Sequence, residues 1–337
     1  MQDFRLSRAS GCRMPLARRL QITRFLTETN LTTLLSNSLS GTSVSKRMAV
    51  EIGGISLGLW CERGMRAALD PGHKSFISSG DASQTCDVEL DISAVTQISL
   101  PSVAPCFSSG GLWSAYTAPT GTQFYFSTPT LGSEPYKAAW FDPTFSRGHI
   151  VLNRILMRTN DETFPLEYPV DELTMMHRLA LGAGVELHAL GLADRDGSGY
   201  LFVGHSGAGK STTARLWMAE HGVRLLSDDR IILRKHDGDF WMYGTPWHGD
   251  AGVASQGRAL LSSIFLLEHF PRNEIVPMAP PQAAAELFAR AFVPHYLGEG
   301  IDFTLGFLES VAQTVSCSTL RFTPTKSAVE AIRHARA

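Results

Sequence analysis

Hydrophobic and polar residues alternate over short distances in the first half of the chain. In three segments the alternation combines with β-branched and aromatic residues, which is typical of half-buried strands. These segments are VEIGGISLGLW at 50–60, DVELDI at 87–92 and TQFYFS at 122–127. Clusters of glycine, proline and serine such as SSGG and APTG separate them and favour turns. We therefore predict a β-rich subdomain over residues 48–164.

The pattern changes to mixed helices and strands over residues 165–337. Leu173, Met176 and Leu179 recur at helical spacing within 170–182, and two glycines at the end of this segment can terminate the helix. Strands are predicted at 185–192, 200–204, 223–226 and 262–269, turns at 193–199 and 236–239, and helices at 280–292 and 325–335. This mixture is typical of an α/β domain.

Residues 1–47 have a different composition from the rest of the chain. Eight arginines and lysines occur there against only Asp3 and Glu28, and serine and threonine crowd 27–45. One interpretation is an organelle transit segment, and the other is that Met48 begins the functional protein. We favour the second interpretation, and under either one we expect this leader to be disordered.

Composition narrows the class of protein. The formal net charge is −2, 44% of residues are hydrophobic and 18% are charged, as in a folded globular protein. A basic stripe interleaved with aromatic residues is absent, so we expect no nucleic-acid partner. There is no run of eighteen apolar residues, so we expect no membrane span. The five cysteines form no C-x-x-C pair, which favours reduced thiols and a cytoplasmic location.

The clearest motif is GHSGAGKS, which follows a predicted strand and precedes a helix-forming stretch. It fits the phosphate-loop pattern G-x-x-x-x-G-K-[ST], in which backbone N–H groups and a helix amino terminus surround phosphate oxygens. Lys210 would neutralise the β- and γ-phosphates, and Ser211 would bind Mg²⁺. The sequence therefore predicts binding of ATP and Mg²⁺ by Gly204, His205, Ser206, Gly207, Ala208, Gly209, Lys210, Ser211 and Thr212.

Two adjacent aspartates follow the phosphate loop closely. Asp228 lies 17 residues after Ser211 (228 − 211), and Asp229 is next. A helix, a turn and the strand VRLL fill this interval, so we expect both acids at the end of the next strand, beside the loop. Neighbouring side chains of an extended chain point to opposite sides, so one carboxylate can face the metal and the other an incoming hydroxyl. Such an arrangement favours a phosphotransferase over a mechanical ATPase. The alternative is that these acids only pair with Arg230 or cap a turn.

These residues resemble the catalytic domain of HPr kinase/phosphorylase, whose phosphate-loop core is similar to that of ATP-dependent phosphoenolpyruvate carboxykinase. The resemblance rests on GHSGAGKS, on LLSDD, and on His188, sixteen residues before Gly204 (204 − 188). It implies a phosphate-loop core with a mixed sheet flanked by helices, and a homo-oligomer. It also implies that Asp228 is the general base or acid, that Asp229 binds the metal with Ser211, and that His188 is an active-site histidine.

The combination SGAGKST, LLSDDR and YGTPW more closely resembles the HPr-kinase-like proteins of modified-peptide clusters, including lasso-peptide kinases. This resemblance implies an ATP-dependent kinase for a serine of a peptide or small protein, such as the C-terminal serine of a lasso-type precursor. Candidate substrate contacts in the same region are Trp247, His248 and Asp250, with Arg258 as a candidate phosphate clamp. Two alternatives remain open: a small-molecule phosphotransferase or carboxykinase-like enzyme, and a nucleotide-binding regulator without catalysis.

Overall fold

The computed structural model describes residues 44–78, 85–157 and 162–335. It contains two β-sheets with helices against their faces. The fold is therefore mixed α/β, as predicted. Most of the leader predicted at residues 1–47 lies outside the described residues, and the first described strand begins at Val44. Among the described residues, no helix is both long and apolar enough to span a bilayer.

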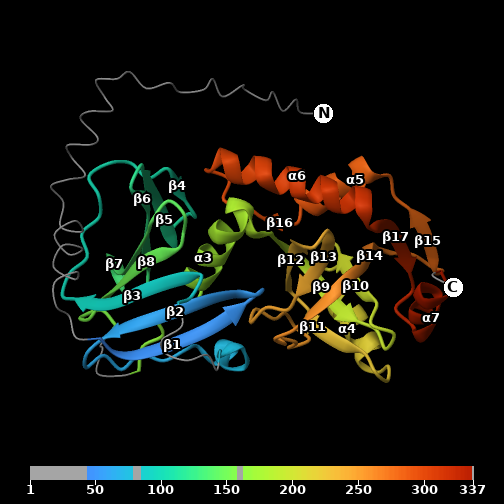
Figure 1. The fold of residues 1–337 in the computed structure, drawn as a ribbon, viewed down its shortest axis with the longest axis horizontal. Helices are drawn as coiled ribbons and strands as arrows, with labels where there is room; N and C mark the ends of the chain where they lie inside the picture. Colours follow the sequence, from blue (N-terminus) through green and yellow to red (C-terminus); the bar gives the residue numbers. More distant parts are fainter. Residues whose placement is uncertain (1–43, 79–84, 158–161, 336–337) are drawn as a thin grey trace, which may run out of the picture. The chain divides into compact units, whose positions relative to one another are not determined.

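The first sheet contains eight strands in the order β1-β2-β3-β8-β7-β6-β5-β4 (Figure 1). The β2–β3 and β3–β8 pairs are parallel and the others antiparallel. The strands are β1 (Val44–Ile52), β2 (Ile55–Glu62), β3 (Val88–Val95), β4 (Phe107–Ser108), β5 (Trp113–Ala118), β6 (Gly121–Thr128), β7 (Gly132–Phe141) and β8 (Arg147–Asn153), with the 3-10 helix η1 (Pro71–Phe76) between β2 and β3.

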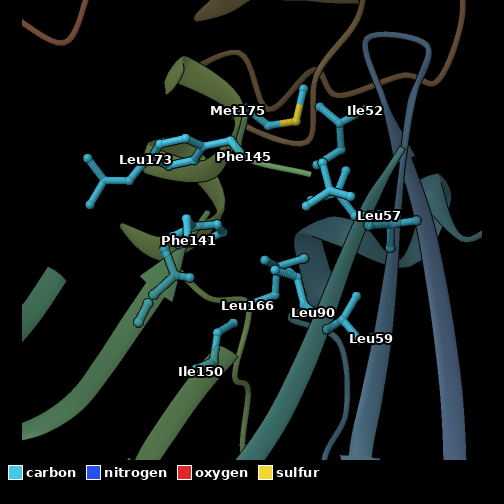
Figure 2. Close-up of a cluster of buried hydrophobic side chains, with 14 of the residues drawn as sticks. Ile52, Leu57, Leu59, Leu90, Phe141, Phe145, Ile150, Leu166, Leu173 and Met175 are labelled. Atoms are coloured by element: carbon cyan, nitrogen blue, oxygen red, sulfur yellow. The ribbon is translucent and has the colours of Figure 1, made fainter. Parts of the chain in front are cut away.

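Alternation along these strands produces the core of the first sheet. Leu57, Leu59 and Leu90 are fully buried on one face, and they pack in one cluster with Leu173 and Met175 of helix α3 (Val170–Arg178). Figure 2 shows Leu57, Leu59 and Leu90 on the strands and Met175 on the side of the helix that is turned towards them. Burial of each such side chain contributes about 1.5–3 kcal/mol, so the apolar stripe of α3 fixes that helix against the sheet. The π-helical turn η2 (Leu179–Ala183) then leads into the second sheet.

The second sheet contains nine strands along the path β10-β9-β12-β13-β14-β17-β15, with β11 and β16 also paired to β9. A further parallel pairing joins β10 to β14. The strands are β9 (Val185–Ala193), β10 (Gly199–Val203), β11 (Arg224–Ser227), β12 (Arg230–His236), β13 (Asp239–Tyr243), β14 (Arg258–His269), β15 (Glu274–Pro277), β16 (Ala291–Phe292) and β17 (Ser316–Phe322).

Helices cover both faces of this second sheet (Figure 1). Strand β10 is buried at every position because its residues alternate between two clusters. Leu201 and Val203 belong to the cluster that contains the helices α5 (Pro280–Phe288) and α6 (Gly298–Thr314). Tyr200 and Phe202 belong to the cluster that contains α4 (Lys210–Met218) and α7 (Lys326–His334). A continuous apolar run is therefore needed to fill both sides of the strand.

Three sequence predictions about individual elements need correction. Residues 50–60 form a hairpin rather than one strand, because Gly53 and Gly54 adopt positive φ angles of 61° and 70° that suit a two-residue turn. The helix predicted over 170–182 is regular only to Arg178. Helix α6 was not predicted at all, since its three glycines hide the apolar stripe.

Candidate functional site

Strand β9 brings the phosphate loop and the acidic pair together. Val203, the last residue of β10, is paired with Ala189 of β9, and on the other side of β9 the Ala189 N–H donates to the Asp229 carbonyl at 2.9 Å. The acidic pair follows β11, which pairs with β9 and not with β10. One strand thus separates the loop from the acids, where direct adjacency was expected. With strands about 4.8 Å apart, the two backbones are about 10 Å apart, a gap that long side chains bridge.

The phosphate loop, Gly204–Ser211, has the backbone that phosphate binding requires. Gly207 and Gly209 have φ angles of 81° and 102°, which L side chains rarely adopt, and α4 begins directly afterwards at Lys210. Lys210 is only 7% exposed, and its ammonium donates to the carbonyls of Gly204 at 3.0 Å and His205 at 3.3 Å. The loop is therefore curled around its own lysine, and a phosphate is the ligand that such a lysine and helix terminus fit.

His269, at the end of β14, supports the phosphate loop from outside. Its ring forms a hydrogen bond with the Gly207 carbonyl at 3.1 Å and stacks on Phe322. The same two rings leave little room beside Gly209, where an added Cβ would lie 3.1 Å from Phe322 Cζ. The glycine at this position is therefore required both by its φ angle and by close packing.

Asp229 and His188 form a side-chain pair near the phosphate loop. His188 Nδ1 lies 3.2 Å from Asp229 Oδ1 and 3.1 Å from the Asp229 carbonyl. The hydrogen bond from His188, with the nearby charge of Arg230, holds the pKa of Asp229 below its ordinary value. Burial lowers the pKa of Lys210, and the Asp229 charge opposes that shift. Asp229 is therefore an ionised carboxylate within electrostatic reach of Lys210.

Asp228 has a different environment from the one predicted for it. It is 2% exposed, and its two oxygens accept three backbone N–H bonds from the loop at residues 247–253: from Gly249 at 3.0 Å, Ala251 at 2.7 Å and Val253 at 3.1 Å. These three bonds occupy most of the roughly four acceptor positions of the carboxylate. They support a structural role for Asp228 in holding this loop, and its role as the general base stays a prediction.

Arg230 supports Asp229 from the side opposite His188. Its guanidinium lies 3.2 Å from Asp229 Oδ2, 2.8 Å from Glu172 Oε1 and 3.4 Å from Glu186 Oε1. The same group lies over the Trp247 and Phe292 rings, whose centroids are 5.4 Å and 4.4 Å away. Sequence reasoning treated this arginine only as a competing partner for the acids; instead it is the centre of three carboxylates.

Glu186 is the buried member of that carboxylate cluster. It is 1% exposed, burial raises its pKa to about 8, and its Oε2 atom has no hydrogen-bond partner among the described residues. The sequence contained one signal for it: in a strand, residues two apart share a face, so Glu186 had to lie on the same face as His188. A buried acid beside a predicted active-site histidine is a recognisable pattern, and it was missed.

The residues predicted to contact the substrate separate into two groups. The Trp247 indole donates to Asp171 Oδ2 at 2.8 Å, while His248 and Asp250 are exposed on the 247–253 loop that Asp228 holds. Arg258 begins β14, and Leu266, eight residues further along this strand, is paired with Val203 at the end of β10. Eight residues of extended chain span about 26 Å, so Arg258 is at the opposite end of the sheet. We withdraw it as a phosphate clamp.

The predicted magnesium ligands fit a phosphate-dependent metal site. Ser211 is half-buried in the first turn of α4, and Asp229 faces the same loop. Within the described residues, no group of three or more histidine, cysteine, aspartate or glutamate side chains could hold a metal ion. Magnesium is commonly bound by one or two protein groups together with substrate phosphates and water, so this donor set fits Mg²⁺ with a bound nucleotide.

Comparisons with known proteins give little further guidance. No family model matches the chain, and no curated protein matches it. Among solved structures, the chain is similar to the Hpr(Ser) kinase/phosphatase from Coxiella burnetii, with 15% sequence identity and a TM-score of 0.27. The match covers 45% of this chain and 95% of that chain. A TM-score this low supports no conclusion about function.

Proposed function

We propose that this protein is an ATP- and Mg²⁺-dependent phosphotransferase that transfers the γ-phosphate to a hydroxyl group. The observation that carries the proposal is the Asp229–His188 pair, whose backbone lies across β9 from the end of β10 and whose carboxylate is within electrostatic reach of Lys210. A module that only binds nucleotide needs the loop, but it does not need an ionised carboxylate held by a histidine and an arginine beside it. Phosphotransfer needs both.

Each residue has a distinct task in the proposed reaction. The phosphate loop and Lys210 would bind the triphosphate, and Ser211 would hold a Mg²⁺ ion, which would supply charge neutralisation at the phosphates. Asp229, predicted as the second metal ligand, is assigned here to the acceptor hydroxyl. Asp229 accepts the proton of the acceptor hydroxyl, while His188 and Arg230 fix its orientation. The acceptor oxygen forms a bond to the γ-phosphorus as the bond to the β-phosphate oxygen breaks, and ADP leaves. Asp229 thus takes the role that the sequence assigned to Asp228.

For the acceptor, we propose a serine hydroxyl of a peptide or small protein. The motif resemblance supports this class, including the C-terminal serine of a lasso-type precursor. The 247–253 loop also supports it, because Asp228 holds that loop beside Asp229 and the exposed side chains of His248 and Asp250 can contact an extended substrate. The β-rich subdomain would then recognise the rest of the acceptor.

Transfer of labelled γ-phosphate tests the proposal directly. The purified protein is incubated with labelled ATP and Mg²⁺ and with two sets of acceptors: peptides with internal or C-terminal serine, and hydroxyl- or carboxylate-bearing metabolites. We expect label on serine peptides, and its loss in Lys210→Ala and Asp229→Asn. Lys235→Ala is the matched control, since Lys235 is an exposed lysine on β12 and its removal should leave transfer intact.

The outcomes separate the three candidate functions. Label on metabolites alone would replace the peptide acceptor with a small molecule. Binding of ATP without transfer to either set would favour a nucleotide-binding regulator and would overturn the phosphotransferase proposal.

A further inference from the structure

The backbone of Arg290 lies beside the start of the phosphate loop, although Arg290 is 79 residues after Ser211 in the sequence (290 − 211). The His188 N–H donates to the Arg290 carbonyl at 2.8 Å, and β16 begins at the next residue, where Ala291 pairs with Leu187. Strand β10 ends opposite Ala189. Since β11 and β12 share one side of β9, β10 and β16 share the other. Arg290 therefore enters the sheet about one residue step, or 3.4 Å, from where the phosphate loop leaves it.

The side chain of Arg290 is half-buried, with 16% of its surface exposed, and is incompletely bonded. Its Nη1 donates to the Glu286 carbonyl and to Glu286 Oε2, both at 2.6 Å. Its Nε is buried and has no hydrogen-bond partner among the described residues, although a buried donor without a partner is costly. The positive charge of Arg290 also lowers the pKa of Lys210. Arg290 and Lys210 are therefore within electrostatic reach of each other, and Asp229 is within electrostatic reach of Lys210.

We propose that Arg290 is a catalytic residue that binds the γ-phosphate of the nucleotide together with Lys210. This inference rests on the proposed function and adds a second cation to its site. Two neighbouring cations repel each other, and a group with several negative oxygens between them removes that repulsion and can accept the unused Nε–H. The β-phosphate and the loop backbone bind ADP without Arg290, so its contribution should appear only when the γ-phosphate is present.

A purely structural role is the competing explanation. The bonds to Glu286 tie the end of α5 to its own last turn, as an i,i+4 pair does. In that case removal of the arginine would loosen α5 and would affect all ligands alike. The two explanations differ in whether Arg290 distinguishes ATP from ADP.

Calorimetric titration with ATP and with ADP, in the presence of Mg²⁺, tests the proposal on the full chain. We expect Arg290→Gln to weaken ATP binding about tenfold or more while ADP binding changes little. Arg290→Lys should recover part of the ATP affinity because it keeps the charge. Glu286→Gln is the matched control: it removes the same ion pair but leaves the arginine, so ATP affinity should be unchanged or higher. Thermal unfolding of each variant reports loss of structure separately.

An equal loss of ATP and ADP affinity in Arg290→Gln would overturn the proposal, as would the same ATP loss in Glu286→Gln. If the wild-type protein binds both nucleotides but transfers no phosphate to any acceptor, the proposed function fails while the ATP-to-ADP comparison still decides the role of Arg290. If the wild-type protein binds neither nucleotide, both proposals fail.

Discussion

Separate replacement of Asp228 and Asp229 by asparagine should have opposite effects on stability and on chemistry. In Asp228→Asn, the amide oxygen can keep two of the three N–H bonds, but the amide nitrogen must replace an acceptor. If it replaces Oδ2, the buried Ala251 N–H, now bonded at 2.7 Å, faces another donor. The two remaining bonds also lose the negative charge of their acceptor.

The magnitude follows from these bonds. A hydrogen bond to a charged group contributes about 1.5–3 kcal/mol, and an unpaired buried donor costs about 1–3 kcal/mol. We therefore expect Asp228→Asn to lower the free energy of unfolding by about 2–4 kcal/mol, or Tm by about 4–10 °C. Asp229→Asn should cost about 1 kcal/mol or less, because Arg230 keeps its contacts with Glu172 and Glu186.

The assays are calorimetric unfolding, amide hydrogen exchange and phosphate transfer. Asp228→Asn should increase exchange at Gly249, Ala251 and Val253 and should retain part of the transfer activity at low temperature. Asp229→Asn should abolish transfer with normal exchange in that loop. Asp239→Asn is the control, since Asp239 is an exposed aspartate at the start of β13, outside this loop. The assignment is refuted if Asp228→Asn leaves Tm unchanged and abolishes transfer while Asp229→Asn stays active.

Two further predictions follow from buried groups and backbone geometry. Burial raises the pKa of Glu186 to about 8, so this carboxyl keeps its proton in the folded state, and the free energy of unfolding falls as the pH rises towards 8. Between pH 6.5 and 8, the free energy of unfolding of the wild type, relative to that of Glu186→Gln, should fall by about 1–2 kcal/mol. This pH window avoids the titration of His177, whose pKa is lowered by burial to about 4, so that its contribution to stability rises with pH. The measurement is urea unfolding, and a stability difference between the wild type and Glu186→Gln that does not change with pH would contradict the reasoning. Gly209→Ala should cost about 1–3 kcal/mol of backbone strain and weaken ATP binding, because φ is 102° and Phe322 is close. Gly238→Ala, with a φ of 93° and open space around it, should lower Tm without changing ATP affinity, and equal affinity losses in the two variants would disprove the role of Gly209.

Features that depend on neighbouring residues were predictable from the sequence. The phosphate loop was recognised because its glycines, lysine and flanking strand are contiguous, and the structure gives Gly207 and Gly209 the positive φ angles that such a loop needs. Alternation also predicted that Asp228 and Asp229 would face different surroundings. The sequence did not predict which of the two aspartates is buried, because the environment of Asp228 depends on three backbone N–H groups more than 20 residues away.

Features that depend on sheet register were missed for the same reason. Arg290 is the last residue before a two-residue strand, and its place beside His188 follows only from the pairing of β16 with β9. Arg333 of α7 binds Asp194 through two nitrogens, at 2.8 Å and 2.7 Å, and also contacts Glu220. In each case tertiary packing determines the partner of a long side chain, and the local sequence pattern does not predict that partner.

The position of the site has a topological cause. Over Leu187–Gly191, strand β9 changes its partner on both sides: β10 gives way to β16 on one side, and β11 gives way to β12 on the other. Where a strand changes partners, the chains beside it must leave or enter the sheet. The phosphate loop and Arg290 emerge on one side of this point and the acidic pair on the other. The phosphate loop, Arg290 and the acidic pair therefore lie near one another as long as β9 keeps its register. A register shift of one residue would move the His188 side chain to the opposite face of the sheet and separate it from Asp229.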